Sequence, residues 1–381
     1  MHPFLISWHE CTIHLCDLTR DKDSRLIMSA SHGLASSDFA YQAEALQGVS
    51  RTFALTIPQL PDALCDVVGN AYLLCRITDT IEDEPTLSAQ QKLMFARQFV
   101  DVVAGRKEAE SFARELGALL SSSTTESEHD LIANTARVVR ITRGFSSSQR
   151  NALERCVRIM SKGMTEFQQK EDLANGLDDV PHLDRYCYHV AGVVGEMLTE
   201  LFCEYSAEID KRREELLALS VSFGQGLQMT NILKDMWDDR QRGACWLPRD
   251  VFLEAGFELG SLSTGHVHSG FSKGLFELVA ITRIHLSNAL QFVMIIPPRE
   301  TGIRLHCLWA LGMAVLTLRR IYAKPNFKSG QEIKISRRSV RAVILVTRIV
   351  VRSNLALKLL FKILTYKLPR SGRKSLEQVQ L

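Results

Sequence analysis

The chain has few aromatic residues and lacks any cysteine pairing. Phe, Trp and Tyr make up 7% of its 381 residues, and 22 Gly and 10 Pro are too few for a collagen-like or low-complexity chain. The nine cysteines include no CxxC pair, so no zinc-binding pattern is present. An odd number of scattered cysteines indicates free thiols in a reducing compartment, and we therefore expect a cytoplasmic protein.

The sequence also lacks long apolar runs and nucleotide-binding turns. No stretch reaches 18 uninterrupted apolar residues, so no transmembrane helix is expected. The apolar segment 4–8 is short and has no basic residues before it, unlike a signal peptide. The nearest approach to a Rossmann turn, Gly224-Gln225-Gly226, lies inside a helical pattern, which excludes that fold.

Helical periodicity dominates what is present, and strand-like alternation is almost absent. Residues 1–40 show little periodicity, and we interpret them as a loosely ordered extension. The pattern over residues 41–335 predicts one all-α domain with short loops between antiparallel helices. Residues 336–381 are expected to form a basic amphipathic tail. Besides a helix in the tail, helices are expected at about 62–83, 88–104, 109–121, 130–142, 147–170, 183–203, 210–239, 272–294 and 300–322.

Two segments, 76–84 and 231–239, each place an Asp at i, an acid at i+3 and an Asp at i+4 on one helix face. Such carboxylates repel one another, and Mg²⁺ binds carboxylate oxygens together with substrate phosphate oxygens. The alternative is a pair of solvated acidic faces. It is disfavoured because both clusters end strongly apolar helices and both have a basic neighbour, Arg76 or Lys234. The candidate metal ligands are Asp79, Glu82, Asp83, Asp235 and Asp239.

Four motifs between residues 42 and 340 resemble, in order, those of the squalene/phytoene synthase family. The resemblance implies the all-α isoprenoid synthase fold, a helical bundle whose two acidic motifs face a central cavity. It also implies head-to-head condensation of two prenyl diphosphates. The motifs are Ser50-Arg51-Thr52-Phe53-Ala54, Tyr72-x-x-x-Arg76-x-x-Asp79-x-x-Glu82-Asp83, the segment from Tyr186 to Gly195, and the segment from Gln228 to Asp239.

The distal segment, 302–337, resembles the squalene synthase branch of the family. That resemblance implies farnesyl diphosphate as substrate, presqualene diphosphate as intermediate, and reduction by NADPH. Lys234 stands where the family commonly has Arg, which keeps the charge but loses the bidentate fork. By resemblance, the residues that contact the nicotinamide nucleotide or a diphosphate are Arg51, Arg76, Lys234 and Lys334, with Arg337 in place of the family's second basic residue.

A tyrosine at the position of Tyr186 in an amphipathic helix is often an ordinary core residue with a satisfied hydroxyl. By resemblance, Tyr186 would instead stabilise or deprotonate the first carbocation, with Tyr72 and Arg76 as further catalytic residues. Gln228 and Asn231 precede Asp235 on the same helix face and could bind phosphate oxygens. The candidate substrate-binding residues are Ser50, Arg51, Phe53, Gln228 and Asn231.

The basic charge is concentrated at the C-terminal end. Residues 333–381 contain 12 Lys or Arg and one Glu, whereas residues 1–332 carry a net charge of −8, from 34 basic and 42 acidic residues. In one helix, Arg341, Arg348 and Arg352 would share a face, and Lys358 and Lys362 would extend it. We expect this helix to lie on a membrane surface. The alternative is a last bundle helix with a solvated basic face; nucleic-acid binding is not expected.

Three other functions remain open at this point. The chain could be a related synthase that stops at presqualene diphosphate or makes phytoene without reduction. It could be a one-substrate terpene cyclase, which rarely has the Tyr186-Cys187-Tyr188-His189 block. A membrane-bound helical scaffold would have no use for two matched acidic motifs. Chain-length preference and oligomeric state are left open.

Overall fold

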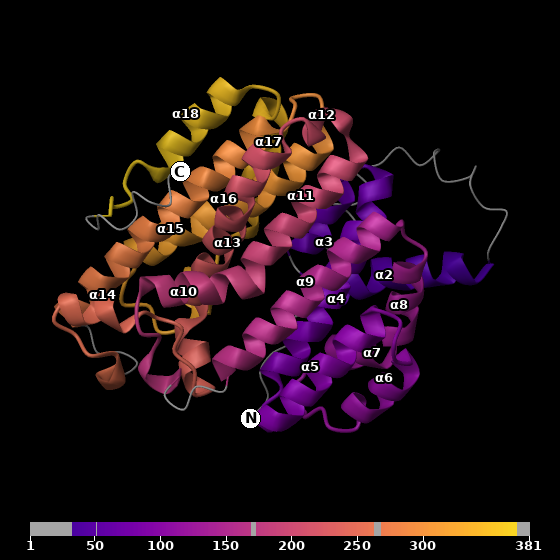
Figure 1. The fold of residues 1–381 in the computed structure, drawn as a ribbon. Coiled ribbons are helices and arrows are strands. Elements are labelled where there is room, and N and C mark those ends of the chain that lie inside the picture. Colours follow the sequence, from indigo (N-terminus) through magenta and orange to yellow (C-terminus); the bar gives the residue numbers. More distant parts are fainter. Residues whose placement is uncertain (1–32, 51, 169–172, 263–267, 372–381) are drawn as a thin grey trace.

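The computed structural model describes residues 33–50, 52–168, 173–262 and 268–371 (Figure 1). Within these ranges every regular element is a helix, and the only β-type pairing is an isolated parallel bridge between Leu177 and Pro248. The expected all-α fold is confirmed. The first half contains α2 (Gly33–Val49), α3 (Phe53–Thr56), η2 (Ile57–Gln59), α4 (Asp62–Asp83), α5 (Ala89–Val103), α6 (Ala109–Gly117), α7 (Glu126–Ala133), α8 (Thr135–Arg143) and α9 (Ser147–Gln168).

The second half is built around longer helices. Its short segments include a π-helix, η4, which follows α10 without a break. The elements are η3 (Leu173–Asn175), α10 (Val180–Cys187), η4 (Tyr188–Gly192), α11 (Val193–Tyr205), α12 (Ala207–Asp210), α13 (Arg213–Gln241), α14 (Arg249–Glu254), η5 (Leu259–Ser261), α15 (Ser269–Ile295), α16 (Thr301–Ala323), η6 (Gly330–Ile333), α17 (Arg337–Val350) and α18 (Asn354–Thr365).

The helix boundaries follow local capping chemistry. Ser88 begins α5 by accepting from the backbone N–H of Gln91, whose side chain accepts from the backbone N–H of Ser88. Thr125 and Glu128 make the same reciprocal pair before α7. The helix expected at 130–142 thus begins earlier, at Glu126, and it is divided at Asn134 into α7 and α8.

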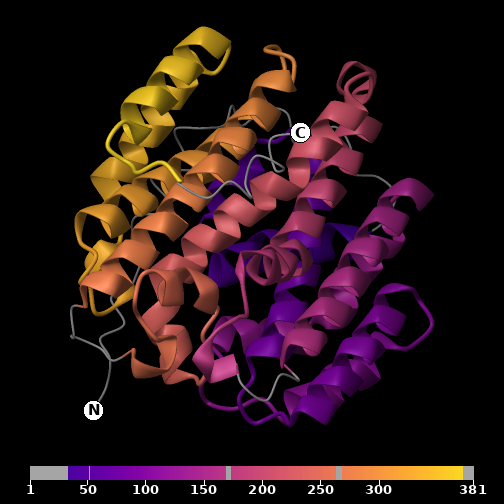
Figure 2. The ribbon, with the colours of Figure 1, turned by 60° about the vertical axis from the view of Figure 1, so that its left-hand side comes forward.

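Helix α13 lies at the centre of the second half and contacts α10, α11, α15 and α16 (Figure 2). Two glycines allow its backbone to approach its neighbours closely. A Cβ at Gly195 would lie 2.1 Å from the Ser220 carbonyl oxygen, and a Cβ at Gly224 would lie 2.1 Å from that of Ala191. Gly224 is thus a helix-packing residue, and the exclusion of a Rossmann turn at this position is confirmed.

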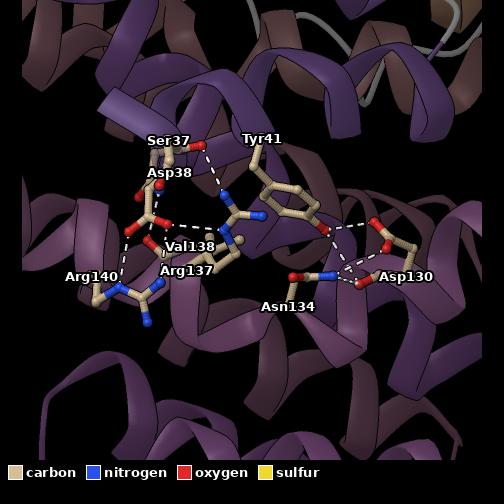
Figure 3. Close-up of polar contacts among 9 residues, drawn as sticks. Ser37, Asp38, Tyr41, Asp130, Asn134, Arg137, Val138 and Arg140 are labelled. Carbon is tan, nitrogen blue, oxygen red and sulfur yellow. Dashed lines mark hydrogen bonds and ion pairs between the residues drawn. The ribbon is translucent and has the colours of Figure 1, made fainter. Parts of the chain in front are cut away.

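The N-terminal boundary differs from the expected one. Helix α2 begins at Gly33, before Tyr41, so residues 33–40 are helical rather than loosely ordered. The buried Asp38 carboxylate accepts hydrogen bonds from Arg137 Nε and Arg140 Nε of α8, both at 2.9 Å (Figure 3). This contact holds the start of α2 on the bundle. Residues 1–32 of the expected extension lie outside the described residues.

The C-terminal segment is two helices rather than one continuous basic helix. The chain leaves helical conformation between α17 and α18, so Arg352 lies in the connection and does not extend the stripe of Arg341 and Arg348. Trp309 of α16 donates from Nε1 to Thr347 Oγ1 at 3.0 Å. Fully buried Arg304 of α16 donates to Asn354 at the start of α18. Both helices are therefore packed onto the bundle (Figure 1).

Helices α15 and α16 have the length and composition of a membrane span. In each, 67% of the most apolar window is buried inside the protein. Core helices of a bundle show the same composition, and α15 packs along both α13 and α16. The two helices are therefore weak evidence for membrane insertion.

Candidate functional site

The two acidic motifs meet at the C-terminal ends of α4 and α13. Arg242, which caps the end of α13, joins them: its Nη1 lies 3.7 Å from Asp83 Oδ1 and its Nη2 lies 2.8 Å from Asp239 Oδ1. The motifs are separated by about 150 residues in the sequence, yet one guanidinium contacts a carboxylate of each. Arg242 was not among the sequence-predicted site residues, although it lies three residues after Asp239.

Burial disfavours the charged forms of these carboxylates. It raises the pKa of Asp79 to about 7 against the lowering effect of Arg76, while the charge of Asp83 raises it further. Burial likewise raises the pKa of Asp239 to about 6, with Asp235 and Asp83 adding to the effect and Arg242 opposing it. The nearby guanidinium groups therefore only partly compensate the negative charge of the site.

Arg76 lies on the α4 side of the site. Its Nη1 is 3.6 Å from Asp79 Oδ2, and its Nη2 is 2.8 Å from Glu128 Oε1 of α7. Its Nε is buried and has no hydrogen-bond partner. Lys92 of α5 donates to the backbone carbonyl of Glu82. Glu128, which the sequence did not indicate, holds Arg76 beside the first motif.

The α13 side of the site contains Lys234 beside Asp235, with Nζ 2.9 Å from Oδ2. The segment η6 packs here, since a Cβ at Gly330 would lie 3.0 Å from Asp235 Oδ1. Lys334 directly follows η6 and is exposed, as is Arg337 at the start of α17. Arg51, the other predicted basic residue, lies outside the described residues.

No group of three or more His, Cys, Asp or Glu in the described part of the chain is close enough to hold a metal ion by itself. Arg242 occupies the position between Asp83 and Asp239. Mg²⁺ sites that act on phosphates usually have one or two protein carboxylates, with waters and substrate oxygens completing the shell. The hard oxygen donors of the two motifs fit such a site.

Tyr186, in the last turn of α10, faces the acidic motifs. Its side chain is 5% exposed and its ring stacks on Trp246, with centroids 3.8 Å apart and planes 8° apart. Burial, followed by the charges of Glu82, Asp83 and Asp239 among its neighbours, raises the pKa of Tyr186 well above its usual value. The hydroxyl therefore stays protonated near neutral pH. Trp246 was missed because no local pattern links it to Tyr186.

A buried polar network holds the helix that carries Tyr186. Ser222 of α13 and His285 Nδ1 of α15 share a 2.9 Å hydrogen bond, and Asn288 donates to Ser222 Oγ at 3.0 Å. Gln225 Nε2 of α13 donates to the Asp184 carbonyl oxygen of α10 at 3.1 Å, whereas His285 Nε2 and Asp184 Oδ1, 3.7 Å apart, make no hydrogen bond. Burial lowers the pKa of His285 to about 4, so the ring is neutral near pH 7. The network connects α10, α13 and α15 two residues before Tyr186.

The predicted substrate residues of the first motif line the junction of α3 and α4. Ser50 Oγ accepts from the Phe53 backbone N–H at 2.9 Å, and the Phe53 and Tyr72 rings lie 5.2 Å apart. The Tyr72 hydroxyl donates to the Val49 carbonyl at 3.3 Å, and burial raises its pKa. On α13, Gln228 is half-buried and Asn231 is exposed, both upstream of Asp235.

Comparison with known proteins adds independent information. The profile of the squalene/phytoene synthase family matches residues 46–339. The squalene synthase of Schizosaccharomyces pombe is 26% identical over 304 residues, which cover 77% of this chain and 64% of that protein. Squalene synthase ERG9 of Gibberella zeae is 31% identical over 206 residues, 54% of this chain and 42% of that protein. The matches thus span less than two thirds of these curated relatives.

Solved structures share the fold. A TcSQS–ligand complex superimposes with a TM-score of 0.72 at 21% identity, covering 90% of this chain and 96% of that chain. A dehydrosqualene synthase in complex with ligand gives a TM-score of 0.60 at 18% identity, covering 84% and 98%. At these identities the likeness establishes the all-α isoprenoid synthase architecture.

Proposed function

Because this chain belongs to the squalene/phytoene synthase family, we propose that it is a squalene synthase. In this proposal it joins two farnesyl diphosphates head to head, through presqualene diphosphate, and forms squalene by reduction with NADPH. The contact of Arg242 with both Asp83 and Asp239 supports the proposal, because the two acidic motifs lie together beside Tyr186 and would bind the diphosphates there. The relatives named squalene synthase support this choice of substrate and product.

Mg²⁺ would be held by Asp79, Glu82, Asp83, Asp235 and Asp239 together with diphosphate oxygens. The raised pKa values of Asp79 and Asp239 support this role, since a cation would stabilise carboxylates that burial disfavours. When bound, the ion supplies positive charge against the negative charge that develops on a departing diphosphate.

The chain's own cations would take part in the same neutralisation. Arg76 and Lys234 lie within reach of the first and second motifs, and each already contacts a carboxylate there. Both can shift their contacts toward an incoming diphosphate, for which a guanidinium or an ammonium group is a suitable partner. Arg242 would hold the two motifs together until the substrate binds.

We propose that Tyr186 stabilises the allylic carbocation as a neutral phenol. Its raised pKa argues against a phenolate base, which leaves the hydroxyl dipole and the ring face. The parallel stack with Trp246 fixes the ring, and an aromatic face attracts a cation within about 6 Å of its centroid. Tyr72, packed against Phe53, would contribute a second aromatic surface. Tyr186 itself is buried, and a carbocation held beside it would be kept from water.

NADPH is proposed as the hydride donor for the second half-reaction. The residues assigned to it are Arg51, Arg76, Lys234, Lys334 and Arg337. The packing of η6 on α13 supports the assignment of Lys334, because this residue follows a segment that borders Asp235. Basic side chains on helices and turns suit the nucleotide's phosphates, and the hydride itself would come from the nicotinamide when bound.

We further propose a cytoplasmic enzyme that is peripherally attached to a membrane surface through α17 and α18. Seven of the eleven large apolar side chains that are exposed in the described residues lie on or just after these two helices. Lys and Arg residues flank them, as in helices that lie in a bilayer interface. The apolar residues are Leu345, Val346, Ile349, Leu355, Leu359, Ile363 and Tyr366.

Product analysis tests the function. Purified protein is incubated with farnesyl diphosphate and Mg²⁺, with and without NADPH, and the products are identified by mass spectrometry. Squalene with NADPH and presqualene diphosphate without it would support the proposal. Presqualene diphosphate under both conditions, or phytoene from geranylgeranyl diphosphate, would instead identify a synthase without reduction. A C15 hydrocarbon would identify a terpene cyclase.

A further inference from the structure

A cationic groove lies away from the acidic motifs, between α15, α18 and the start of α13. Its volume is about 750 Å³. A smaller hollow of about 430 Å³ adjoins it and shares Arg283, Ser287 and Gln291 with its lining. Five cationic side chains and one acidic side chain, Glu215, line the larger groove. The cations are Arg212, Arg283, Lys358, Lys362 and Arg370.

Within the described part of the chain, most of this positive charge has no counter-ion. Arg212 pairs with Glu215, Nε to Oε1 at 2.5 Å. Among the described residues, no carboxylate lies within 4 Å of the other four cations. Arg283 Nε is buried without a hydrogen-bond partner. Burial, together with the charge of Arg370, lowers the pKa of Arg283, so an anion in the groove would relieve both effects.

The groove is also partly apolar and borders an exposed apolar surface. Met294 and Ile295 of α15 and Phe361 of α18 line it. At 100° per residue, Lys358 and Lys362 lie next to the exposed face formed by Leu355, Leu359, Ile363 and Tyr366. Tyr366, 81% exposed, belongs to both the groove and this face. Figure 1 shows α18 at the periphery of the bundle, and the four residues of this face are 53–81% exposed.

We propose that this groove binds the headgroup of an anionic phospholipid when α17 and α18 rest on a bilayer. The phosphate would lie among Arg283, Lys362 and Arg370, and an acyl chain would follow Phe361 toward the apolar face. Guanidinium and ammonium groups bind phosphate oxygens in this way, and basic pockets beside membrane-facing helices recognise lipid headgroups. The inference rests on the proposed membrane association and adds a headgroup preference to it.

The test uses the whole chain and two double variants of equal charge. Arg283→Gln with Lys362→Gln removes two groove cations, whereas Arg338→Gln with Arg341→Gln removes two exposed cations of α17 outside the groove. Flotation is measured with phosphatidylcholine vesicles, with and without phosphatidic acid. Thermal unfolding is measured with dihexanoyl phosphatidic acid, dihexanoyl phosphatidylcholine or inorganic phosphate. Circular dichroism verifies that both variants fold.

We expect phosphatidic acid to strengthen vesicle binding. The groove variant should lose about 30-fold in affinity for these vesicles, roughly fivefold for each cation removed. Dihexanoyl phosphatidic acid should raise the unfolding midpoint of the natural chain and of the α17 variant but not that of the groove variant. Dihexanoyl phosphatidylcholine should raise none of the three. Equal losses in both variants, or an equal midpoint shift from inorganic phosphate, would overturn the headgroup site. Absence of flotation with a retained midpoint shift would instead refute the membrane association and keep the site.

Discussion

Replacement of Asp38 by Asn tests whether the start of α2 belongs to the fold. The Asp38 side chain is 5% exposed, and its carboxylate accepts three hydrogen bonds from two guanidinium groups, at 2.9, 2.9 and 3.0 Å (Figure 3). Breaking a buried pair costs about 3–5 kcal/mol. The side chains of Arg137 and Arg140 are 31% and 46% exposed and regain water, which reduces the cost. We therefore expect a loss of about 3 kcal/mol in the free energy of unfolding.

Urea unfolding at about pH 7 measures this loss, and amide hydrogen exchange shows whether α2 opens locally. The hydrogen bond from Arg140, opposed by burial and aided by Arg137, lowers the pKa of Asp38. The carboxylate therefore stabilises the fold fully above its unfolded pKa, near 3.8, and this contribution disappears as the pH falls through the lower folded value. The difference between the two proteins should accordingly shrink below about pH 4.

The matched control is Asp101→Asn, because Asp101 and its partner Arg106 are 49% and 55% exposed. This exposed pair should change stability by about 0–1 kcal/mol. If Asp38→Asn changed neither unfolding nor hydrogen exchange in α2 by more than the control does, the docking of residues 33–40 would be refuted.

Four further predictions concern the site and the C-terminal helices. Asp79→Asn should lower turnover roughly 1,000-fold in a product assay. The same variant should raise the unfolding midpoint of the metal-free protein. With a folded pKa of about 7, the Asp79 carboxyl destabilises the fold as it ionises between pH 4 and 7, and an amide does not ionise. Tyr186→Phe should slow presqualene diphosphate formation about 100-fold in rapid-quench experiments while diphosphate affinity is kept; an unchanged rate would make Tyr186 a packing residue. Arg242→Gln should raise the Mg²⁺ concentration needed for half-maximal activity, because the guanidinium contacts both motifs and organises them. An unchanged Mg²⁺ requirement would refute this role of Arg242. Asn354→Ala should leave Arg304 buried without its partner and cost about 2 kcal/mol in urea unfolding; no loss would contradict the docking of α18.

Local sequence signals predicted most of the helices. The apolar periodicity of α4 and α13 and the acidic residues at their ends are visible in the sequence, and α4 has the expected bounds, 62–83. The helix predictions are wrong where tertiary packing determines the backbone conformation. The turn at Asn134 divides a continuous helical pattern, and the π-helix after Tyr186 lies where α13 packs closely against its neighbours through glycine.

The candidate site was predicted in part for the same reason. The i, i+3, i+4 spacing of carboxylates is a local signal, whereas the residues that complete the site come from distant segments. Arg242 contacts both motifs only because α4 and α13 end close to each other, and Trp246 meets Tyr186 only because the segment after α13 lies beside the start of α10. Glu128 likewise reaches Arg76 from α7. The spacing of residues in a single sequence does not predict contacts between such distant segments.

We propose that both acidic motifs serve one reaction site for two prenyl diphosphates. Calorimetric titration with farnesyl thiodiphosphate, which resists ionisation, tests it directly in the presence and absence of Mg²⁺. We predict that two equivalents of the analogue bind per chain with Mg²⁺. Asp79→Asn and Asp239→Asn should each weaken the binding of both equivalents, because the two motifs would share Arg242 and the Mg²⁺ ions. One equivalent per chain, or two that bind equally well without Mg²⁺ and in both variants, would show that the two motifs do not form one magnesium-dependent site.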